Sequence, residues 1–295
     1  MKPTDTSELG LEQLIVRHLA GISEHPPVQA NGAQEPQAVY APGGYVLGRA
    51  SDYNRDVALD VVQLLAFLRS TQPRAVDTLE LEADGVRRPQ FLHRLQGEIT
   101  KRGVVDVLRK GVSHGPVHVD LYRLLPTPGN DAAADAFKRN IFSVTRQVRY
   151  SNDSGNELDL VIFINGLPVA TAELKTDNTQ SIDDAVWQYR KDRLPQGEPL
   201  LKFGRGALVH FAVSNNEIQM TTKLAGPKTV FLPFNLGRDG GAGNPVNPNG
   251  SATSYLWERV LQRDNWLQIL ERFVNQQTTE KVDPVSGTRK RSEQI

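Results

Sequence analysis

Two apolar runs joined by Asn165-Gly166 constrain the fold of this chain more than any other feature of the sequence. The runs cover residues 158–164 and 168–174, and each has the length and apolar character of a β-strand. Asn and Gly both tolerate the positive φ angles that a tight hairpin turn requires. The sequence therefore predicts an antiparallel strand pair at this point.

Around this pair, the first half of the chain is predicted to be mainly helical and the second half rich in strands. Apolar residues recur at helical spacing over 8–21, 56–69 and 91–110, and Gly111 follows as a stop signal. Ser181 and Asp184 form a capping-box pattern that opens a helix after the hairpin. A closing helical region covers 254–275, and further strands are predicted over 117–122, 142–150, 207–213, 218–222 and 229–232.

Helices first, then a strand-rich block with a crossing helix, predict an α/β fold. We expect a central mixed β-sheet flanked by helices, with the N-terminal helices packed on it. One domain would span residues 1–275, with a helical part over about 1–125 and a core over about 135–275. Residues 25–44 predict a long loop, and the polar residues 276–295 predict a linker.

The composition excludes several classes of protein. The chain has 295 residues, of which 39% are hydrophobic, enough for one large domain or two small ones. It contains no cysteine, which excludes disulfides and thiolate zinc sites and favours the cytoplasm. No apolar stretch approaches the ~20 residues that span a bilayer, so no membrane association is expected. The 34 basic and 34 acidic residues balance, so a nucleic-acid site would have to concentrate positive charge locally.

Asp159 and Glu173 are acidic residues within the two apolar runs. Burying a carboxylate among apolar neighbours is costly unless a cation or hydrogen bonds compensate it. Lys175 lies two residues beyond Glu173, so both would project from one face of a strand. The simpler alternative is an amphipathic hairpin whose charged residues face solvent.

The hairpin register distinguishes these alternatives. A strict two-residue loop places Asp159 opposite Ala172, and Glu173 then faces away. A three-residue loop, or one bulge, brings Asp159 opposite Glu173, with Gly166 in the left-handed position. A joint site therefore predicts the longer turn or a bulge.

Two carboxylates about 5 Å apart on neighbouring strands can share a hard cation such as Mg²⁺. Such an ion would polarise a phosphate, lower the pKa of a bound water and stabilise the departing oxygen. Lys175 would orient the attacking water and offset charge on the phosphorus. His114 and His118 are the competing metal ligands, but Gly115 and Pro116 between them deny a shared helix.

Asp159, thirteen intervening residues and Glu173-Leu174-Lys175 resemble the PD-(D/E)xK nuclease motif. The whole segment 158–175 is similar to the endonuclease segment of the R subunits of type I restriction enzymes. The similarity covers nearly the whole chain. It includes residues 45–73, 207–213, 220–224, 231–235, 241–245, 255–258 and 263–264.

The resemblance implies Mg²⁺-dependent cleavage of double-stranded DNA, driven by an ATP-dependent translocase in the same polypeptide. It also implies that the full-length subunit joins a methyltransferase core of specificity and modification subunits. The sequence holds no Gly-x-x-x-x-Gly-Lys-Ser/Thr motif, and the glycine-rich residues 237–243 lack its lysine. We therefore expect the N-terminal part of a longer subunit, with ATP required only by the motor.

Relatives carry a Gln-x-x-x-Tyr element on the helix after the lysine, which is implied to support the site and contact DNA. Gln188 matches its glutamine, but Tyr189 follows directly, and Asp192 occupies the fourth position. Relatives also place a glutamate on the first helix near the metal. Glu12 matches it best and Glu8 is the competitor, while an exposed helix carboxylate explains either residue equally well.

Basic residues cluster after the hairpin. Arg190 and Arg193 would share one side of a helix, and with Lys191 they would follow a DNA backbone. Lys202 and Arg205 extend the cluster. A solvated helix face explains the same residues equally well.

Two other functions stand beside a nuclease domain. One is a non-catalytic docking module between the translocase and the methyltransferase core, and the other is a free-standing repair nuclease. Asp159, Glu173 and Lys175 favour a nuclease, because a docking module has no use for a lysine beside two buried acids. Residues 231–245 would dock another part of the subunit or form ordinary core.

Overall fold

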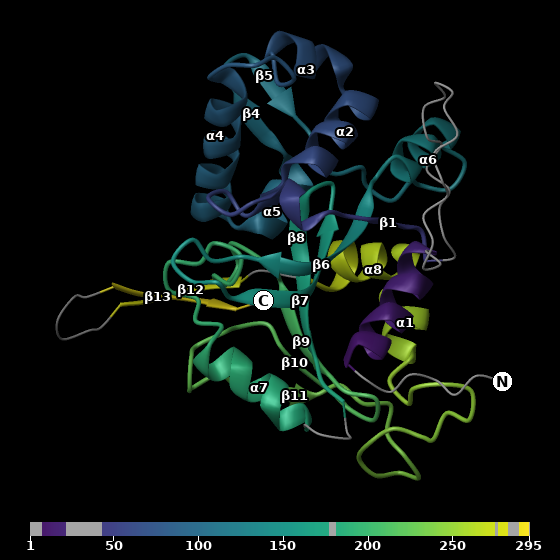
Figure 1. Cartoon of the computed structure of the whole chain (residues 1–295). Coiled ribbons are helices and arrows are strands. Elements are labelled where there is room, and N and C mark those ends of the chain that lie inside the picture. Colours follow the sequence, from purple (N-terminus) through teal and green to yellow (C-terminus); the bar gives the residue numbers. More distant parts are fainter. Residues whose placement is uncertain (1–7, 22–42, 177–180, 275–276, 283–288, 295) are drawn as a thin grey trace.

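A computed structural model of the chain has a seven-stranded mixed sheet at its centre (Figure 1). The structure describes residues 8–21, 43–176 and 181–274, and only the backbone of 277–282 and 289–294. The strand order is β1-β6-β7-β8-β9-β10-β11. Strand β1 pairs with β6 and β8 with β9 in parallel, and the remaining neighbours are antiparallel. The expected α/β class is confirmed.

The longest strands of the sheet lie at its centre, and shorter strands flank them. The central strands are β6 (Phe142–Arg149), β7 (Glu157–Ile164) and β8 (Leu167–Leu174). The flanking strands are β1 (Tyr45–Leu47), β9 (Val209–Val213), β10 (Ile218–Thr221) and β11 (Leu232–Pro233). Three small hairpins lie outside the sheet: β2 (Tyr53–Asn54) with β3 (Leu59–Asp60), β4 (Val112–His114) with β5 (Val117–Val119), and β12 (Gln277–Val282) with β13 (Arg289–Gln294).

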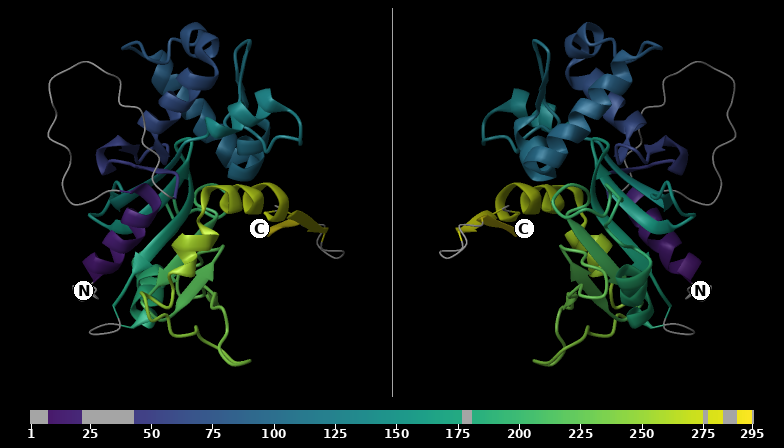
Figure 2. Two further views of the ribbon diagram at one scale, coloured as in Figure 1. Left: turned by 90° about the vertical axis from the view of Figure 1, so that its right-hand side faces the viewer. Right: turned by 90° about the vertical axis from the view of Figure 1, so that its left-hand side faces the viewer.

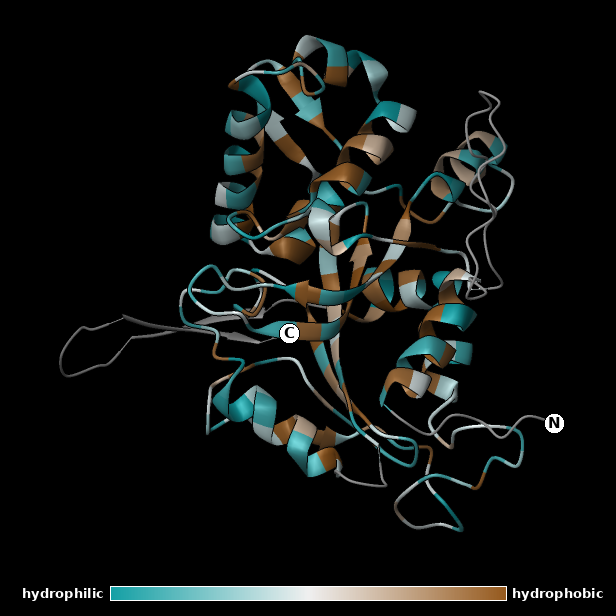
Figure 3. Ribbon diagram, viewed as in Figure 1, coloured by the Kyte–Doolittle hydropathy of each residue, from teal (hydrophilic) through white to brown (hydrophobic). Residues whose placement is uncertain are grey.

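Both faces of the central strands are covered, which explains why these strands are nearly continuous runs of apolar residues (Figures 2 and 3). Leu160 and Ile162 of β7 join a core cluster with α1 (Glu8–Ala20) and most of the other helices. Val161 and Phe163 join a second cluster with α7 (Ile182–Lys191). Alternate residues of one strand therefore serve two cores on opposite faces.

The N-terminal helices pack on the sheet, as expected. Their apolar side chains belong to the same cluster as Ile164 and Leu167 at the hairpin end of β7 and β8. The proposed boundary between a helical part and a core remains a prediction, and β1 joins the sheet from within the first part. The helices of this group are α2 (Val61–Thr71), α3 (Pro73–Thr78), α4 (Arg87–Arg102) and α5 (Val104–Lys110), preceded by the short turn η1 (Ala50–Asp52).

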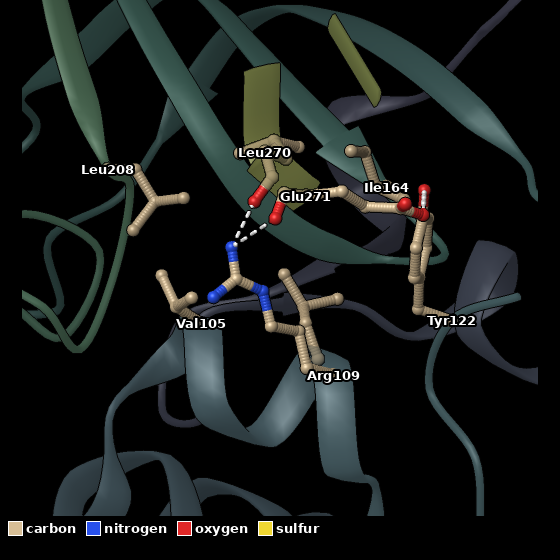
Figure 4. A pocket seen from close by; sticks show the side chains of 8 residues that line it. Val105, Arg109, Tyr122, Ile164, Leu208, Leu270 and Glu271 are labelled. Carbon is tan, nitrogen blue, oxygen red and sulfur yellow. Dashed lines mark hydrogen bonds between the residues drawn. The ribbon is translucent and has the colours of Figure 1, made fainter. Parts of the chain in front are cut away.

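An arginine of α5 fixes the C-terminal helical region to this group. The Arg109 guanidinium donates to the carbonyls of Leu270 and Glu271 beside a small cavity (Figure 4). It also donates to the Val274 carbonyl at 2.7 Å. The Glu271 carboxylate accepts hydrogen bonds from the Tyr122 hydroxyl and the Leu125 amide. The region consists of η2 (Leu256–Val260), α8 (Arg263–Gln268) and η3 (Ile269–Phe273).

Local capping and glycine geometry explain where the observed helices differ from the predicted ones. The single helix predicted over 91–110 is two helices, because Gly103 adopts φ 93° and ends α4. The helix predicted from residue 56 begins at Val61, because the Asp60 carboxylate accepts a hydrogen bond from the Gln63 amide and caps it. Gly111 ends α5 as predicted.

Three further segments differ from the predictions. A helix, α6 (Asp131–Lys138), lies in a stretch for which no element was predicted, and the Asn130 side chain caps it. The strand predicted over 117–122 is the second arm of the β4–β5 hairpin. Residues 276–295 were expected to be a polar linker, yet the described backbone there pairs as β12 and β13. The loop predicted over 25–44 lies mostly outside the described residues.

We predict that Gly166→Ala strongly destabilises the fold. A Cβ atom at Gly166 would lie 2.3 Å from the Asp60 carbonyl oxygen and 2.8 Å from the Leu64 amide nitrogen, in a backbone with φ 80°. We expect a loss of about 2–4 kcal/mol in the free energy of unfolding, measured by urea denaturation. Gly197→Ala is the matched control, because Gly197 has φ 78° and open space around it. Its cost should be only about 1 kcal/mol, and equal losses at the two positions would contradict the steric argument.

Candidate active site

The hairpin brings Asp159 and Glu173 together through a bulge. Its turn has only two residues, because Ile164 pairs with Leu167, so the predicted three-residue loop is wrong. The register then shifts by one residue, and from Leu160–Ala172 onward the pairing is the one that places Asp159 opposite Glu173. The bulge alternative is therefore confirmed.

Val169 is the additional residue of the bulge, since Phe163 pairs with Pro168 and Ile162 with Ala170. The turn itself is tight, with φ 50° at Asn165 and φ 80° at Gly166.

The Asp159 carboxylate is fixed to the neighbouring strand. Its Oδ2 accepts a hydrogen bond from the Leu174 amide at 2.7 Å. Burial raises the pKa of Asp159, whereas this hydrogen bond and the positive charge of Lys175 lower it, and the carboxylates of Glu8 and Glu12 raise it further. Three charged side chains from two parts of the chain, Lys175, Glu8 and Glu12, thus act on Asp159.

Glu173 is more deeply buried, with 1% of its surface exposed. Burial raises the pKa of Glu173 to about 8, and the neighbouring Asp159 carboxylate adds to the rise, against the lowering by Arg193 and Lys175. The two acids therefore repel each other in a place with little solvent. Such a pair is a favourable environment for a cation.

Arg193 is the direct partner of Glu173. Its Nε donates to Glu173 Oε1 at 2.7 Å, and only 9% of the residue is exposed. The sequence predicts that Arg193 faces DNA beside Arg190. That expectation is wrong, because Arg193 lies beyond the end of α7, where the chain turns its guanidinium inward to the buried carboxylate.

Both glutamates of α1 reach the site, with different partners. Glu8 Oε1 accepts a hydrogen bond from Lys175 Nζ at 3.0 Å. Glu12 is buried and pairs with the Arg146 guanidinium and with the Gln147 amide, the latter at 2.8 Å. The sequence does not decide whether Glu8 or Glu12 lies near Asp159. In the structure, both glutamates act on Asp159.

Tyr189, expected to contact DNA, is fully buried, so that expectation is also wrong. Its hydroxyl shares a hydrogen bond of 2.7 Å with Thr171 Oγ1, which also bonds His210 Nδ1 at 2.8 Å. Burial lowers the pKa of His210 to about 3, so this histidine is neutral. The apolar stripe of α7 contained the signal, since Ala185 and Val186 lie four and three residues before Tyr189.

Other residues of α7 have mixed surroundings. Gln188 Oε1 is buried and lacks a protein hydrogen-bond partner among the described residues. Arg190 Nε donates to the Thr229 carbonyl at 3.1 Å, and Lys191 is exposed. The capping box at the start of the helix forms as predicted, with the Ser181 amide donating to Asp184 Oδ2 at 2.7 Å.

The donor set suits a hard cation. Within the described parts of the chain, no group of three or more His, Cys, Asp or Glu side chains converges to hold a metal ion. Mg²⁺ in proteins is often bound by one or two carboxylates and keeps several waters, so Asp159 and Glu173 fit it without a third ligand. His114 and His118 do not compete, because the register His114–Val117 and Ser113–His118 puts them on opposite faces of a hairpin.

The seven-stranded mixed sheet with helices around it is an α/β architecture consistent with a nuclease-like fold. A family described as the type I restriction enzyme R protein N terminus matches residues 72–229, and the chain belongs to this family. A search of curated proteins gave no significant match. Among the described residues, no helix has the length and apolar character needed to cross a membrane.

We predict that the stability of the protein falls as pH rises. The pKa of Glu173 is about 8 in the folded chain and near 4.5 when unfolded, so between these values the folded state holds a proton that the unfolded state releases. The contribution is complete below about pH 4.5 and is lost through pH 8, at no more than about 1.4 kcal/mol per pH unit. Urea denaturation at pH 5, 6.5 and 8, without divalent cations, measures it.

Glu173→Gln should make this pH dependence shallower, because the amide cannot titrate. The same substitution at Glu80, a half-exposed residue of the helical group, should leave the slope unchanged. An unaltered slope in Glu173→Gln would show that Glu173 titrates alike in the folded and unfolded states.

Proposed function

We propose that this domain is the DNA-cleaving part of a type I restriction enzyme R subunit, hydrolysing phosphodiester bonds of double-stranded DNA with Mg²⁺. The observation that supports this most directly is the bulged pairing that brings Asp159 beside Glu173, with Lys175 just beyond the end of the same strand. The family assignment supports the coarser statement, an R-subunit N terminus.

Each residue of the cluster has a role in this proposal. Asp159 and Glu173 hold the cation, which when bound supplies Lewis-acid activation of the phosphate and of water. Arg193 holds Glu173 in one orientation through its 2.7 Å hydrogen bond. Lys175 orients the attacking water and offsets charge at the phosphorus, in exchange for its contact with Glu8. Burial of Glu173 and Lys175 keeps these two side chains away from bulk solvent and strengthens their interactions.

We propose a supporting layer on α7. Gln188 has a buried acceptor oxygen without a protein partner, which fits a hydrogen bond to a water or a substrate group in the site. Lys191 is exposed, and Arg190 is partly exposed, so both can meet a DNA backbone.

The partners of the domain follow from the same proposal. Double-stranded DNA would be delivered by an ATP-driven translocase of the full-length R subunit, in the cytoplasm, and the methyltransferase core would select the site. This chain carries no ATP-binding motif of its own, so ATP would act only through that motor.

A docking role is a second candidate that one observation favours. Within 230–246, Val230, Leu232, Leu236 and Val246 expose 68, 60, 53 and 74% of their surfaces. Exposed apolar side chains at this density suit contact with another part of an assembly. One domain can both dock and cleave. Only a nuclease needs the cluster of Asp159, Glu173 and Lys175, so substitutions in this cluster distinguish the two functions.

We predict that Glu173→Ala and Lys175→Ala each reduce DNA cleavage at least about 100-fold, because each removes charge that stabilises the transition state. The measurement is cleavage of plasmid DNA by the complete R subunit assembled with its partner subunits, Mg²⁺ and ATP. Translocation and ATP hydrolysis should persist in both variants.

Lys138→Ala is the control for the lysine, since Lys138 is an exposed residue of α6. Cleavage at the wild-type rate by Glu173→Ala or Lys175→Ala, in a complex that assembles, would leave docking as the function of this domain.

A further inference from the structure

Gln147 on β6 has a left-handed backbone, with φ 47°. A side chain at Cβ makes this conformation unfavourable, and such strain persists where the surrounding structure imposes it, often beside a functional site. Gln147 was not among the residues that the sequence analysis selected.

The strained residue changes the direction of β6. Val144 packs in the core on one face of the sheet, and Val148 packs in the core on the other. In a regular strand, residues four apart share a face. The left-handed conformation at Gln147 coincides with this change.

Gln147 on β6 lies directly opposite Asp159 on the neighbouring strand β7. The register pairs Arg146 with Leu160 and Val148 with Leu158, which leaves Gln147 and Asp159 between these pairs on β6 and β7. The irregular point of one strand therefore faces the acid of the next.

The side chain of Gln147 leads from this point to α1. Its Nε2 donates to Glu12 Oε2 at 2.8 Å, while Arg146 Nε donates to Glu12 Oε1. Glu12 is 3% exposed, and its hydrogen bond to Gln147 joins it to the position of β6 that faces Asp159. Two consecutive residues of β6 thus hold both oxygens of a buried carboxylate near the proposed cation site.

We propose that Gln147 is a positioning residue: its left-handed backbone directs the amide to Glu12 and, with Arg146, fixes that carboxylate near Asp159, where it supports a hydrated divalent cation. This role rests on the proposed nuclease function. It also assigns different roles to the two glutamates of α1. Glu12 supports the hydrated cation, and Glu8 accepts a hydrogen bond from Lys175.

Glu12 acts from outside the ligand set in this proposal. Both of its oxygens already accept hydrogen bonds, and no three carboxylates converge among the described residues. A carboxylate that bonds the waters of a cation, rather than the cation itself, commonly changes metal affinity by 10-fold or more.

The test uses Gln147→Gly, because glycine adopts the left-handed backbone without strain but has no amide to hold Glu12. The probe is Mg²⁺ alone, then Mn²⁺ alone, titrated against the melting temperature of the chain. We expect folding to be preserved, and the cation concentration for half-maximal stabilisation to rise about 10-fold. Glu12→Gln should give a similar rise, and the double variant should show less than the sum of the two effects.

Glu80→Gly is the matched control, because Glu80 has φ 50° and lies on the surface of the helical group. Its half-maximal cation concentration should equal that of the wild type. An unchanged value in Gln147→Gly and Glu12→Gln, with stabilisation abolished in Asp159→Asn, would overturn the positioning role alone. Absence of cation-dependent stabilisation in the wild type would overturn the proposed cation site and this role together.

Discussion

The burial of the Glu173 carboxylate beside the partly buried Asp159 carboxylate is the constraint on which the arrangement of the site depends. Glu173 is 1% exposed, and Asp159 lies close enough to raise its pKa. Buried charges of one sign require compensation from nearby groups. Here it comes from three directions: Arg193 from beyond the end of α7, Lys175 from the same strand, and the Leu174 amide from the backbone. The cation that we propose to bind there would add positive charge next to the two acids.

The location of the hairpin bulge follows from packing around the turn. The Gly166 carbonyl accepts a hydrogen bond from the Asp60 amide, and the Gly166 Cα lies against Asp60 and Leu64. Little room is left there for a longer loop. The additional residue is therefore accommodated within the strand, at Val169. The helical group packs against the turn and so fixes the bulge, and the bulge in turn sets the pairing of Asp159 with Glu173 at the other end of the hairpin.

Two helices complete the site from opposite faces of the sheet. Helix α1 brings Glu8 and Glu12, which engage the lysine and the strained segment of β6. Helix α7 brings a buried tyrosine beneath the site, and the residues beyond it bring Arg193 to Glu173. A mixed sheet covered on both faces permits this, because its central strands present successive side chains to each layer in turn. The arrangement of the site is thus consistent with the family of the chain, and we propose DNA cleavage as its activity.

The sequence by itself determined the elements whose signals are local. The Asn165-Gly166 turn, the two apolar strands, the capping box at Ser181 and the stop at Gly111 all follow from backbone preferences of neighbouring residues. Local preference also limits what can be predicted, since Gly103 divides a helix that periodicity alone would continue.

Only the tertiary structure decided the partners of the charged residues. Arg193 could face DNA or a buried acid, and Tyr189 could face solvent or the core, because a helix fixes direction only relative to what packs against it. The separate hydrogen-bond partners of Glu8 and Glu12 likewise depend on contacts between segments more than 130 residues apart. Such contacts are set by the packing of layers, which neighbouring residues in the sequence do not encode.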